Sequence, residues 1–260
     1  MLKSPSIFLS HGSPTLLIDD IPARAFLRGL SESIHKPSAI IAVSAHNVAR
    51  RVTVGVAEAY HQVADFGDFP EELYRVSYQP PGHPALGESI LGALLDAGID
   101  AEGSTQGGID HGIWIPVSLI YPEGDVPVVP VSLQSDLDPL QHLKIGAALR
   151  ELRKQHDVLI LASGSMTHNL RDFGRYGLHD PPRDYAVEFA DRVEQLLTGG
   201  KGAELLDWLE LVPQAARNHP TVEHFMPLFV AMGAGEGAKA TALHRSYAFA
   251  MLAMDAYAFD

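Results

Sequence analysis

Short apolar runs that end in turn residues recur along the chain. Four of them predict buried strands, over residues 5–10, 38–45, 126–133 and 157–164. Residues 51–56 alternate apolar and polar side chains, which predicts a strand that can pair with one of these. Pro130 lies inside the third run and favours an edge strand or a bulge there, because proline has no N–H to give to a sheet. The apolar and aromatic residues 246–259 predict strand pairing near the C-terminus.

Between these runs the apolar positions recur with a helical period. The predicted helices cover residues 84–98, 139–155, 183–200, 202–211 and 220–235. Asp138 before Pro139 is a typical helix start, and the pair Gly199–Gly200 is a typical helix end. Strands alternate with helices, so the pattern favours an α/β layered architecture. No Ser-, Gly- or Pro-rich linker divides the 260 residues, and we expect one domain over residues 1–260.

Composition narrows the possible functions. The formal net charge of −13 disfavours nucleic acid as a partner, because an acidic chain repels phosphate groups. No apolar run reaches the roughly eighteen residues of a membrane span, and the N-terminus lacks the pattern of a signal peptide. The chain has no cysteine, which excludes disulfides, thiolate catalysis and cysteine-based metal sites. We therefore expect a cytoplasmic protein without membrane attachment, in which any metal is bound by His, Asp or Glu.

Three of the 13 histidines come at or shortly after the ends of predicted buried strands: His11, His46 and His168. If these strands are parallel, all three imidazoles reach the same sheet edge, where ligands bind in open α/β sheets. Either of the first two alone could cap its strand by hydrogen bonding, but His11 and His46 at equivalent positions favour a metal site. His168 could be a further ligand or an acid–base group, since the pKa of imidazole suits proton transfer near neutral pH.

The segment 219–224 contributes two further histidines. His219 and His224 are five positions apart, so on one helix they point apart and only one is expected to reach a common site. We expect His224, inside the helix, to be that residue, and His219 to cap the helix N-terminus. Glu223 is an alternative carboxylate ligand, but on a helix it points about 100° away from His224. The two are therefore not expected to bind one metal together.

The other histidines are less informative. His111 follows Asp110, which suggests an oriented imidazole; the alternative is a loop before a buried helix or strand. Most of the rest are expected to be solvated: His35, His61, His83, His142, His156, His179 and His244. Arg171, Arg175 and His179 could meet a carboxylate on an aromatic ligand, although their surroundings favour a solvated loop. Gly164–Ser165 lacks the second glycine of a nucleophile turn, which disfavours a serine hydrolase.

Five segments form an ordered set: 10-SHGSP-14, 44-SAHN-47, 110-DHGIWIPV-117, 163-SGSMTHNL-170 and 219-HPTVEHFMPL-228. This set resembles the class III (LigB-type) extradiol ring-cleavage dioxygenases, and more narrowly the 4,5-DOPA dioxygenase extradiol branch. Residues 69–82 and 251–259 also resemble that branch, so the resemblance spans nearly the whole chain.

The resemblance implies a sandwich with a central mixed, mostly parallel sheet flanked by helices, and a mononuclear non-haem metal at the strand ends. His11, His46 and His224 match the metal ligands of the family. His168 matches a histidine described as an acid–base catalyst or an additional ligand, and His111 matches a histidine near substrate and dioxygen. Fe(II) is expected for activity, and Zn(II) is a possible occupant.

Two departures accompany the resemblance. The segment 65-DFGDFP-70 has Gly67–Asp68 where the branch usually has Tyr–Gly, which could alter the wall of the substrate pocket. The third ligand is a histidine instead of the glutamate of protocatechuate-type enzymes. A site of three neutral ligands carries one negative charge less, which should change the redox properties of iron and could favour zinc.

The functional hypothesis is an extradiol dioxygenase that inserts O2 into a catechol, DOPA-like or another aromatic diol, to give a semialdehyde acid. The alternative is a zinc-dependent hydrolase on the same three-histidine site, with Glu223 or Asp110 as its base. A third class, a binding module without catalysis, is disfavoured because all five motif histidines are present. The oligomeric state is left open.

Overall fold

A computed structural model describes residues 5–236 and 239–260. Its strands are β1 (Ser6–Ser10), β2 (Ala39–Ala49), β3 (Val52–Gly55), β4 (His61–Gln62), β5 (Ala101–Ser104), β6 (Gly108–Ile109), β7 (Val128–Gln134), β8 (Val158–Gly164), β9 (Thr241–His244), β10 (Tyr247–Ala248), β11 (Leu252–Ala253) and β12 (Ala256–Phe259). Its helices are α1 (Pro22–Ser33), α2 (Glu71–Tyr74), α3 (Pro84–Asp96), α4 (His111–Ile120), α5 (Pro139–Gln155), α6 (Asp184–Thr198), α7 (Trp208–Leu211), α8 (Ala215–Asn218) and α9 (Met226–Ala234). Short 3-10 helices cover Pro14–Leu17, Leu170–Asp172 and Gly202–Asp207.

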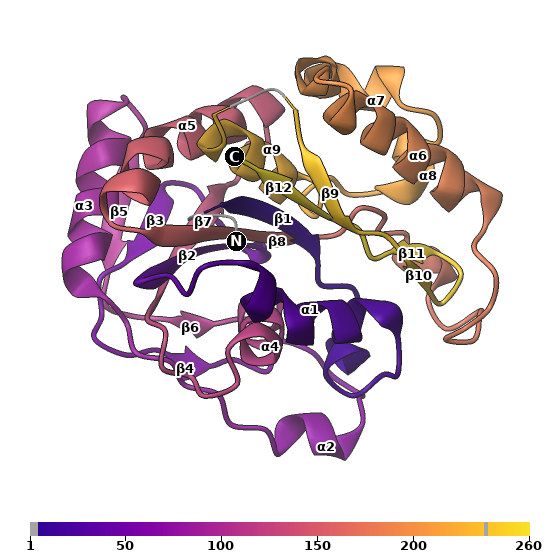
Figure 1. The fold of residues 1–260 in the computed structure, drawn as a ribbon, viewed down its shortest axis with the longest axis horizontal. Coiled ribbons are helices and arrows are strands. Elements are labelled where there is room, and N and C mark those ends of the chain that lie inside the picture. The colour runs from indigo at the N-terminus through magenta and orange to yellow at the C-terminus, as the bar shows by residue number, and fades with distance from the viewer. Residues whose placement is uncertain (1–4, 237–238) are drawn as a thin grey trace.

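Eight strands form one mixed sheet in the order β5-β3-β7-β2-β8-β1-β12-β9. The four central strands β7, β2, β8 and β1 are mutually parallel, whereas β12 and β9 add an antiparallel edge. On the other side, β3 is antiparallel to β7 and parallel to β5. Helices α3, α5 and α9 lie on one side of the sheet and α1 and α4 on the other (Figure 1). The expected α/β sandwich with a mixed, mostly parallel sheet is confirmed.

The central strands read as unbroken apolar runs because both faces of the sheet are covered. Successive residues of β2 alternate between the two cores: Ile41 packs in the core under α5 and α9, and Ile40 packs in the core under α1 and α4. The same alternation holds in β1, where Phe8 lies in the first core and Ile7 in the second. This alternation fixes the strand register, since a slip by one residue would move every side chain to the wrong face.

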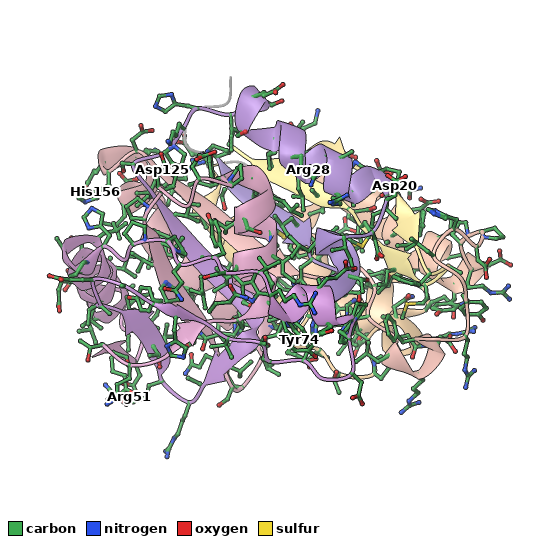
Figure 2. The ribbon with its side chains drawn as sticks, turned by 90° about the horizontal axis from the view of Figure 1, so that it is seen from below. Asp20, Arg28, Arg51, Tyr74, Asp125 and His156 are labelled. Carbon is green, nitrogen blue, oxygen red and sulfur yellow. The ribbon has the colours of Figure 1, made fainter. Side chains whose placement is uncertain are left out.

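The surface differs from these cores in its charged side chains. At the β5 edge of the sheet, Arg51 lies at the periphery (Figure 2) and its guanidinium donates to Asp100 and Glu102, each over 2.7 Å. Within the described residues, no helix is long and apolar enough to cross a membrane.

The expectation that Pro130 marks an edge strand is wrong. Strand β7 is an interior strand, with β2 on one side and β3 on the other. Its pairing with β3 is limited to Val54 and Val131, and the Pro130 ring lies against Gly55 of β3, which has no side chain to displace. A bulge does occur beside it, but in β2, where residues 44–47 stand opposite Ser132 alone.

Two other expectations change. The helix predicted over 220–235 begins only at Met226, and the preceding residues form turns because Pro220 and the contacts of His224 hold them out of a helix. His142 is fully buried instead of solvated. Its Nδ1 donates to the Asp138 carbonyl over 2.8 Å and its Nε2 accepts the Gln134 N–H over 3.1 Å, so both ring nitrogens are satisfied inside the protein.

Candidate metal centre

The parallel strands β1, β2 and β8 bring their carboxyl ends to one sheet edge. In the register of the sheet, Ser10 pairs with Gly164 and Ser44 pairs with Ser163, so the chain leaves these strands at the same level. His11 is the first residue after β1. His46 lies in the bulged part of β2, just beyond its pairing with β8. The expected convergence of these histidines is therefore present.

His224 reaches this edge from the turn before α9. Ser165 donates its backbone N–H to the His224 carbonyl over 2.9 Å, which ties the turn to the end of β8. Gly164 permits this approach, because a Cβ at this position would overlap the same carbonyl oxygen. His224 was expected inside a helix; instead it lies in the turn two residues before α9, and its backbone carbonyl is held by the neighbouring strand end.

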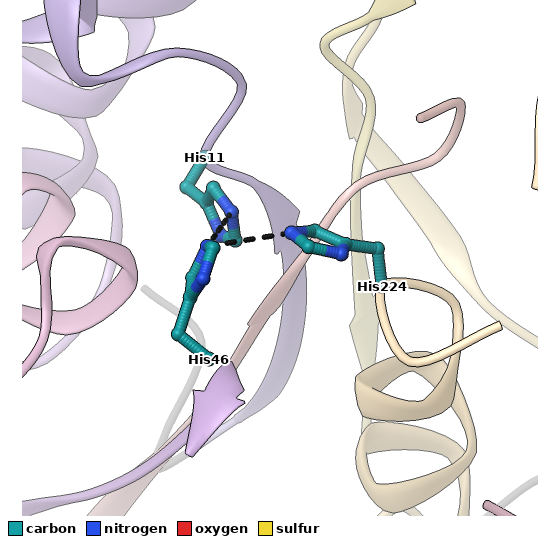
Figure 3. Close-up of side chains that lie close together, drawn as sticks. All are labelled: His11, His46 and His224. Carbon is teal, nitrogen blue, oxygen red and sulfur yellow. Dashed lines mark hydrogen bonds between the residues drawn. The ribbon is translucent and has the colours of Figure 1, made fainter. Parts of the chain in front are cut away.

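The three Nε2 atoms face one another (Figure 3). The Nε2 of His46 lies 3.1 Å from the Nε2 of His11 and 3.3 Å from the Nε2 of His224. The three donor atoms all lie within 4.8 Å of one another. His11 and His224 are buried, and the side chain of His46 is 24% exposed, so the cluster is open on the His46 side.

The opposite ring nitrogens have partners of their own. His11 Nδ1 lies 2.9 Å from the Ser163 hydroxyl, and His224 Nδ1 lies 2.9 Å from a Glu223 carboxylate oxygen. A carboxylate only accepts hydrogen bonds, so His224 carries its proton on Nδ1 and leaves a lone pair on Nε2. His46 Nδ1 lies 3.8 Å from Asp65, beyond hydrogen-bond distance. A hydrogen bond such as that from His224 to Glu223 fixes the tautomer of a metal-binding histidine.

Burial keeps the three imidazoles neutral. It lowers the pKa of His11 and of His224 well below 6.5, and the neighbouring imidazoles lower it further. Burial, followed by the effect of His111, lowers the pKa of His46 to about 4. Three neutral imidazoles with their Nε2 atoms gathered at one point can all turn a lone pair toward a shared cation. The donor set therefore fits a metal ion, and three imidazole nitrogens suit Fe(II) or Zn(II).

Two further histidines border the cluster. The His168 ring stacks on that of His224 with centroids 3.4 Å apart, and neither of its ring nitrogens has a hydrogen-bond partner among the described residues. Burial lowers its pKa to about 4. The His111 ring lies 4.1 Å from that of His46, and its Nδ1 donates to Asp65 over 2.9 Å. The cluster thus has an unbonded neutral imidazole on one side and an oriented imidazole on the other.

A cavity of about 330 Å³ opens onto these rings. His46, His111, His168 and His224 form its polar end. Its remaining walls come from the turn after β1, the loop before α2, the segment after β8 and β11. The volume is at the lower end of the roughly 300–1,000 Å³ of small-molecule sites. It accommodates a small ligand next to the three Nε2 atoms.

His219, expected to cap a helix N-terminus, does not reach this site. It ends α8 and is buried among Phe189, Trp208 and Phe225, where its Nε2 donates to the Met166 carbonyl over 2.9 Å.

Asp65 is a site residue that the sequence did not suggest. One carboxylate oxygen accepts both the Nδ1–H and the backbone N–H of His111, and the other lies near His46. Asp65 belongs to an irregular loop, where no periodic pattern points to a partner. Ser163 was equally hidden, because a serine inside an apolar strand is usually a packing residue.

Comparisons with known proteins find similar chains of nearly the same length. Residues 5–260 match the family described as "Catalytic LigB subunit of aromatic ring-opening dioxygenase". The chain is 38% identical to the 4,5-DOPA dioxygenase extradiol of Beta vulgaris over 259 residues, covering 98% of this chain and 96% of the relative. It is 32% identical to the protein of the same name from Escherichia coli (strain K12), covering 90% of this chain and 86% of that one. The crystal structure of an uncharacterized protein from Escherichia coli K12 matches with a TM-score of 0.81 and 29% identity, covering 98% of this chain and 99% of that one.

Proposed function

The chain belongs to the LigB family of aromatic ring-opening dioxygenases, and from this membership we propose that it is a metal-dependent extradiol dioxygenase acting on a catechol. The overall reaction adds both atoms of O2 to the diol and opens the ring beside the two hydroxyls, which gives a semialdehyde acid. The observation that carries the proposal is the convergence of three neutral imidazole Nε2 atoms at the polar end of a small cavity.

We assign His11, His46 and His224 as the ligands of a non-haem metal, with Fe(II) expected for activity and Zn(II) able to use the same donors. When bound, the metal supplies Lewis acidity toward the diol and one-electron chemistry with dioxygen. Three protein donors leave coordination positions open, which a structural site does not. The rings of His11 and His224 are held through Nδ1 by Ser163 and Glu223, and Asp65 lies 3.8 Å from Nδ1 of His46.

His168 is the proposed acid–base residue. Burial lowers its pKa to about 4, so the ring is neutral at physiological pH and has a lone pair to offer to a proton. It lines the cavity and its nitrogens have no partner among the described residues, so a diol hydroxyl can approach them. We propose that His168 takes a proton from the diol and returns it as the ring opens. Its ring stacks on that of His224, and donor atoms of His168, Glu223 and His224 lie within 4.8 Å of one another, so a His168 variant must test this role against that of a fourth ligand.

His111 is the proposed hydrogen-bonding residue on the opposite side. Asp65 accepts its Nδ1–H, which leaves its Nε2 directed away from that carboxylate. The ring edge lines the cavity near His46. We propose that His111 orients the reacting oxygens, and that the apolar walls of the cavity exclude water from them.

The two carboxylates that the hydrolase alternative would use as a base, Glu223 and Asp110, both make bonds within the scaffold. Glu223 accepts from the His224 ring and from the Thr221 hydroxyl through the same oxygen. Asp110 accepts from the Ser44 hydroxyl over 2.6 Å and caps α4 by accepting the Gly112 N–H over 2.9 Å. Each carboxylate thus serves the scaffold through one oxygen, and neither is among the described residues that line the cavity, where a substrate would bind.

The test is an anaerobic reconstitution of metal-free protein with Fe(II), followed by a panel of catechols that includes DOPA and protocatechuate. Air is then admitted, and oxygen uptake is followed together with the yellow absorbance of the ring-opened product. We expect uptake with wild-type protein and none with His11→Ala, which lacks one proposed ligand. Protein that binds Fe(II) stoichiometrically and consumes no oxygen with any catechol would contradict the proposal.

A further inference from the structure

The cavity lining has two chemically different parts. Beside the four histidines, Gly12 and Ser13, it consists of six apolar residues: Pro14, Phe66, Phe69, Leu170, Phe173 and Leu252. No lysine or arginine is among the described residues that line it. A diol bound at the histidine end would therefore direct the rest of its ring and its substituent against hydrocarbon.

The basic residues on the neighbouring segment face elsewhere. Arg175 donates to Asp172 over 3.2 Å, and Arg183 lies over the Tyr176 ring at 5.5 Å. Arg171 is exposed and does not line the cavity. A carboxylate held against this apolar wall would lose part of its water without gaining a cation, which is unfavourable. The net charge of −13 adds a general repulsion of anions.

The wall is preformed by its own contacts. Asp172 is buried, and its carboxylate accepts from the Tyr185 hydroxyl over 2.9 Å and from the Asn169 amide over 3.3 Å. These bonds hold the segment that carries Leu170 and Phe173. On the other side, the Phe66 ring packs against Phe69, Tyr74 and Trp114. Because both sides are held in place, the apolar surface does not depend on rearrangement by a ligand.

We propose that the substrate is a single-ring aromatic diol whose substituent is uncharged and apolar, such as a short alkyl group. This inference rests on the proposed function and specifies its substrate class. DOPA carries an ammonium and a carboxylate on its side chain, so it and carboxylated catechols are expected to be poor ligands of this chain, although the relatives from Beta vulgaris and Escherichia coli are named for DOPA. The cavity volume of about 330 Å³ restricts the substituent to a few heavy atoms.

The experiment compares ligands that differ mainly in charge. The Fe(II)-loaded protein is titrated anaerobically with 4-ethylcatechol, 3,4-dihydroxyphenylacetate, its methyl ester and DOPA, and the Kd of each is measured. The kcat/KM for oxygen uptake is then measured for the same compounds. We expect the Kd of 4-ethylcatechol and of the methyl ester to be at least about tenfold lower than the Kd of the two charged compounds. The values of kcat/KM should follow the same order.

Variants at the apolar wall of the cavity test whether this wall causes the preference for neutral ligands. Phe173 is 37% exposed and lies on the cavity rim, so Phe173→Arg can place a cation there without disturbing a core. We expect this variant to shift the ratio of acid to ester affinity about tenfold toward the acid. Phe173→Leu is the matched control and should keep the wild-type ratio. Arg171→Ala should leave the affinity for every ligand unchanged.

The outcomes separate this inference from the proposed function. If the neutral diols bind more tightly than the charged ones but no oxygen is consumed, the apolar site is supported and the proposed dioxygenase activity is overturned. Oxygen uptake with DOPA or the acid preferred over the neutral compounds would support the dioxygenase and overturn the apolar site. A loss of DOPA binding in Arg171→Ala, or no saturable binding of any neutral diol, would also overturn it.

Discussion

At the scale of single residues, Asp65 connects two imidazoles of the site. It accepts two hydrogen bonds from His111 and lies 3.8 Å from His46 Nδ1. Asp65→Asn keeps the shape but removes the charge that orients both rings. Loss of a partner of this kind typically lowers metal affinity or activity 10–100-fold. We expect the metal Kd to rise and kcat to fall, each by up to about 10–100-fold. Chelator competition measures the Kd, and oxygen uptake measures kcat.

Asp68→Asn is the control for this change. It makes the same substitution in the same loop, on an exposed residue, and asparagine tolerates the positive φ of 54° found there. This variant should match the wild type in both measurements. Equal losses in the two variants would show that the loop responds to any loss of charge and that Asp65 has no special role.

His168 gives a second prediction at this scale. It stacks on His224 but lies outside the cluster of converging donors, so its loss should affect proton transfer more than metal binding. We expect His168→Gln to lower kcat by about 10²–10⁴. The iron content, measured by atomic absorption, should remain near that of the wild type. A parallel loss of iron and activity would make His168 a ligand.

At the scale of elements, the proposed metal site depends on the contact between the end of β8 and the turn before α9. Gly164→Ala would place a methyl group onto the His224 carbonyl oxygen and within 3.1 Å of Pro227. Overpacking of this kind costs about 1–3 kcal/mol. We expect a lower free energy of unfolding in urea and weaker metal binding, because the turn that carries His224 must move.

Gly29→Ala provides the comparison. Gly29 lies in α1, and a Cβ there meets nothing within 4 Å. Its replacement should leave metal binding unchanged and stabilise the protein by up to about 1 kcal/mol, since alanine favours a helix over glycine. If Gly164→Ala behaved like Gly29→Ala, the close approach of β8 to His224 would not be a constraint on the site.

The elements also show what the sequence could and could not predict. Buried strands were predictable because coverage on both faces leaves an unbroken apolar run, as in 157–164. The helix α1 was not predicted, and the predicted helix over 220–235 started too early, because tertiary contacts of His224 override the local pattern. The prediction of an edge strand at Pro130 was wrong for a similar reason, because Gly55 of β3 leaves room for the proline ring inside the sheet.

The residues of the candidate site also divide into some that the sequence could predict and some that it could not. His11 and His46 were predictable because parallel strands end at a common edge. Asp65 and Ser163 could not be predicted, because their role depends on which ring nitrogen each of them faces. The packing of the sheet, the loop and α4 together sets these positions.

At the scale of the whole molecule, two electrostatic effects oppose each other as the pH falls. The net charge of −13 moves toward zero near the isoelectric point of about 5.4, which relieves repulsion and favours the folded state. The buried histidines act in the other direction. The unfolded chain binds protons at them near pH 6.5, whereas in the folded protein the pKa of His46, of His168 and of His219 is lowered to about 4. The balance therefore decides the acid stability of the metal-free protein.

His219 isolates this second effect, because it lies outside the metal cluster. Its Nε2 donates to Met166, and its Nδ1 is buried without a partner among the described residues, so a second proton would have no acceptor. Burial lowers its pKa from 6.5 to about 4, so its contribution to stability is complete above pH 6.5 and is lost as the pH falls toward 4, up to about 3 kcal/mol. We expect the urea midpoint of metal-free protein to fall between pH 7 and pH 5, and to fall less in His219→Gln, whose amide can still donate to Met166. An equal fall in both proteins would assign the acid sensitivity to the other buried groups, and a rise in the wild type would mean that the relief of surface repulsion is the larger effect.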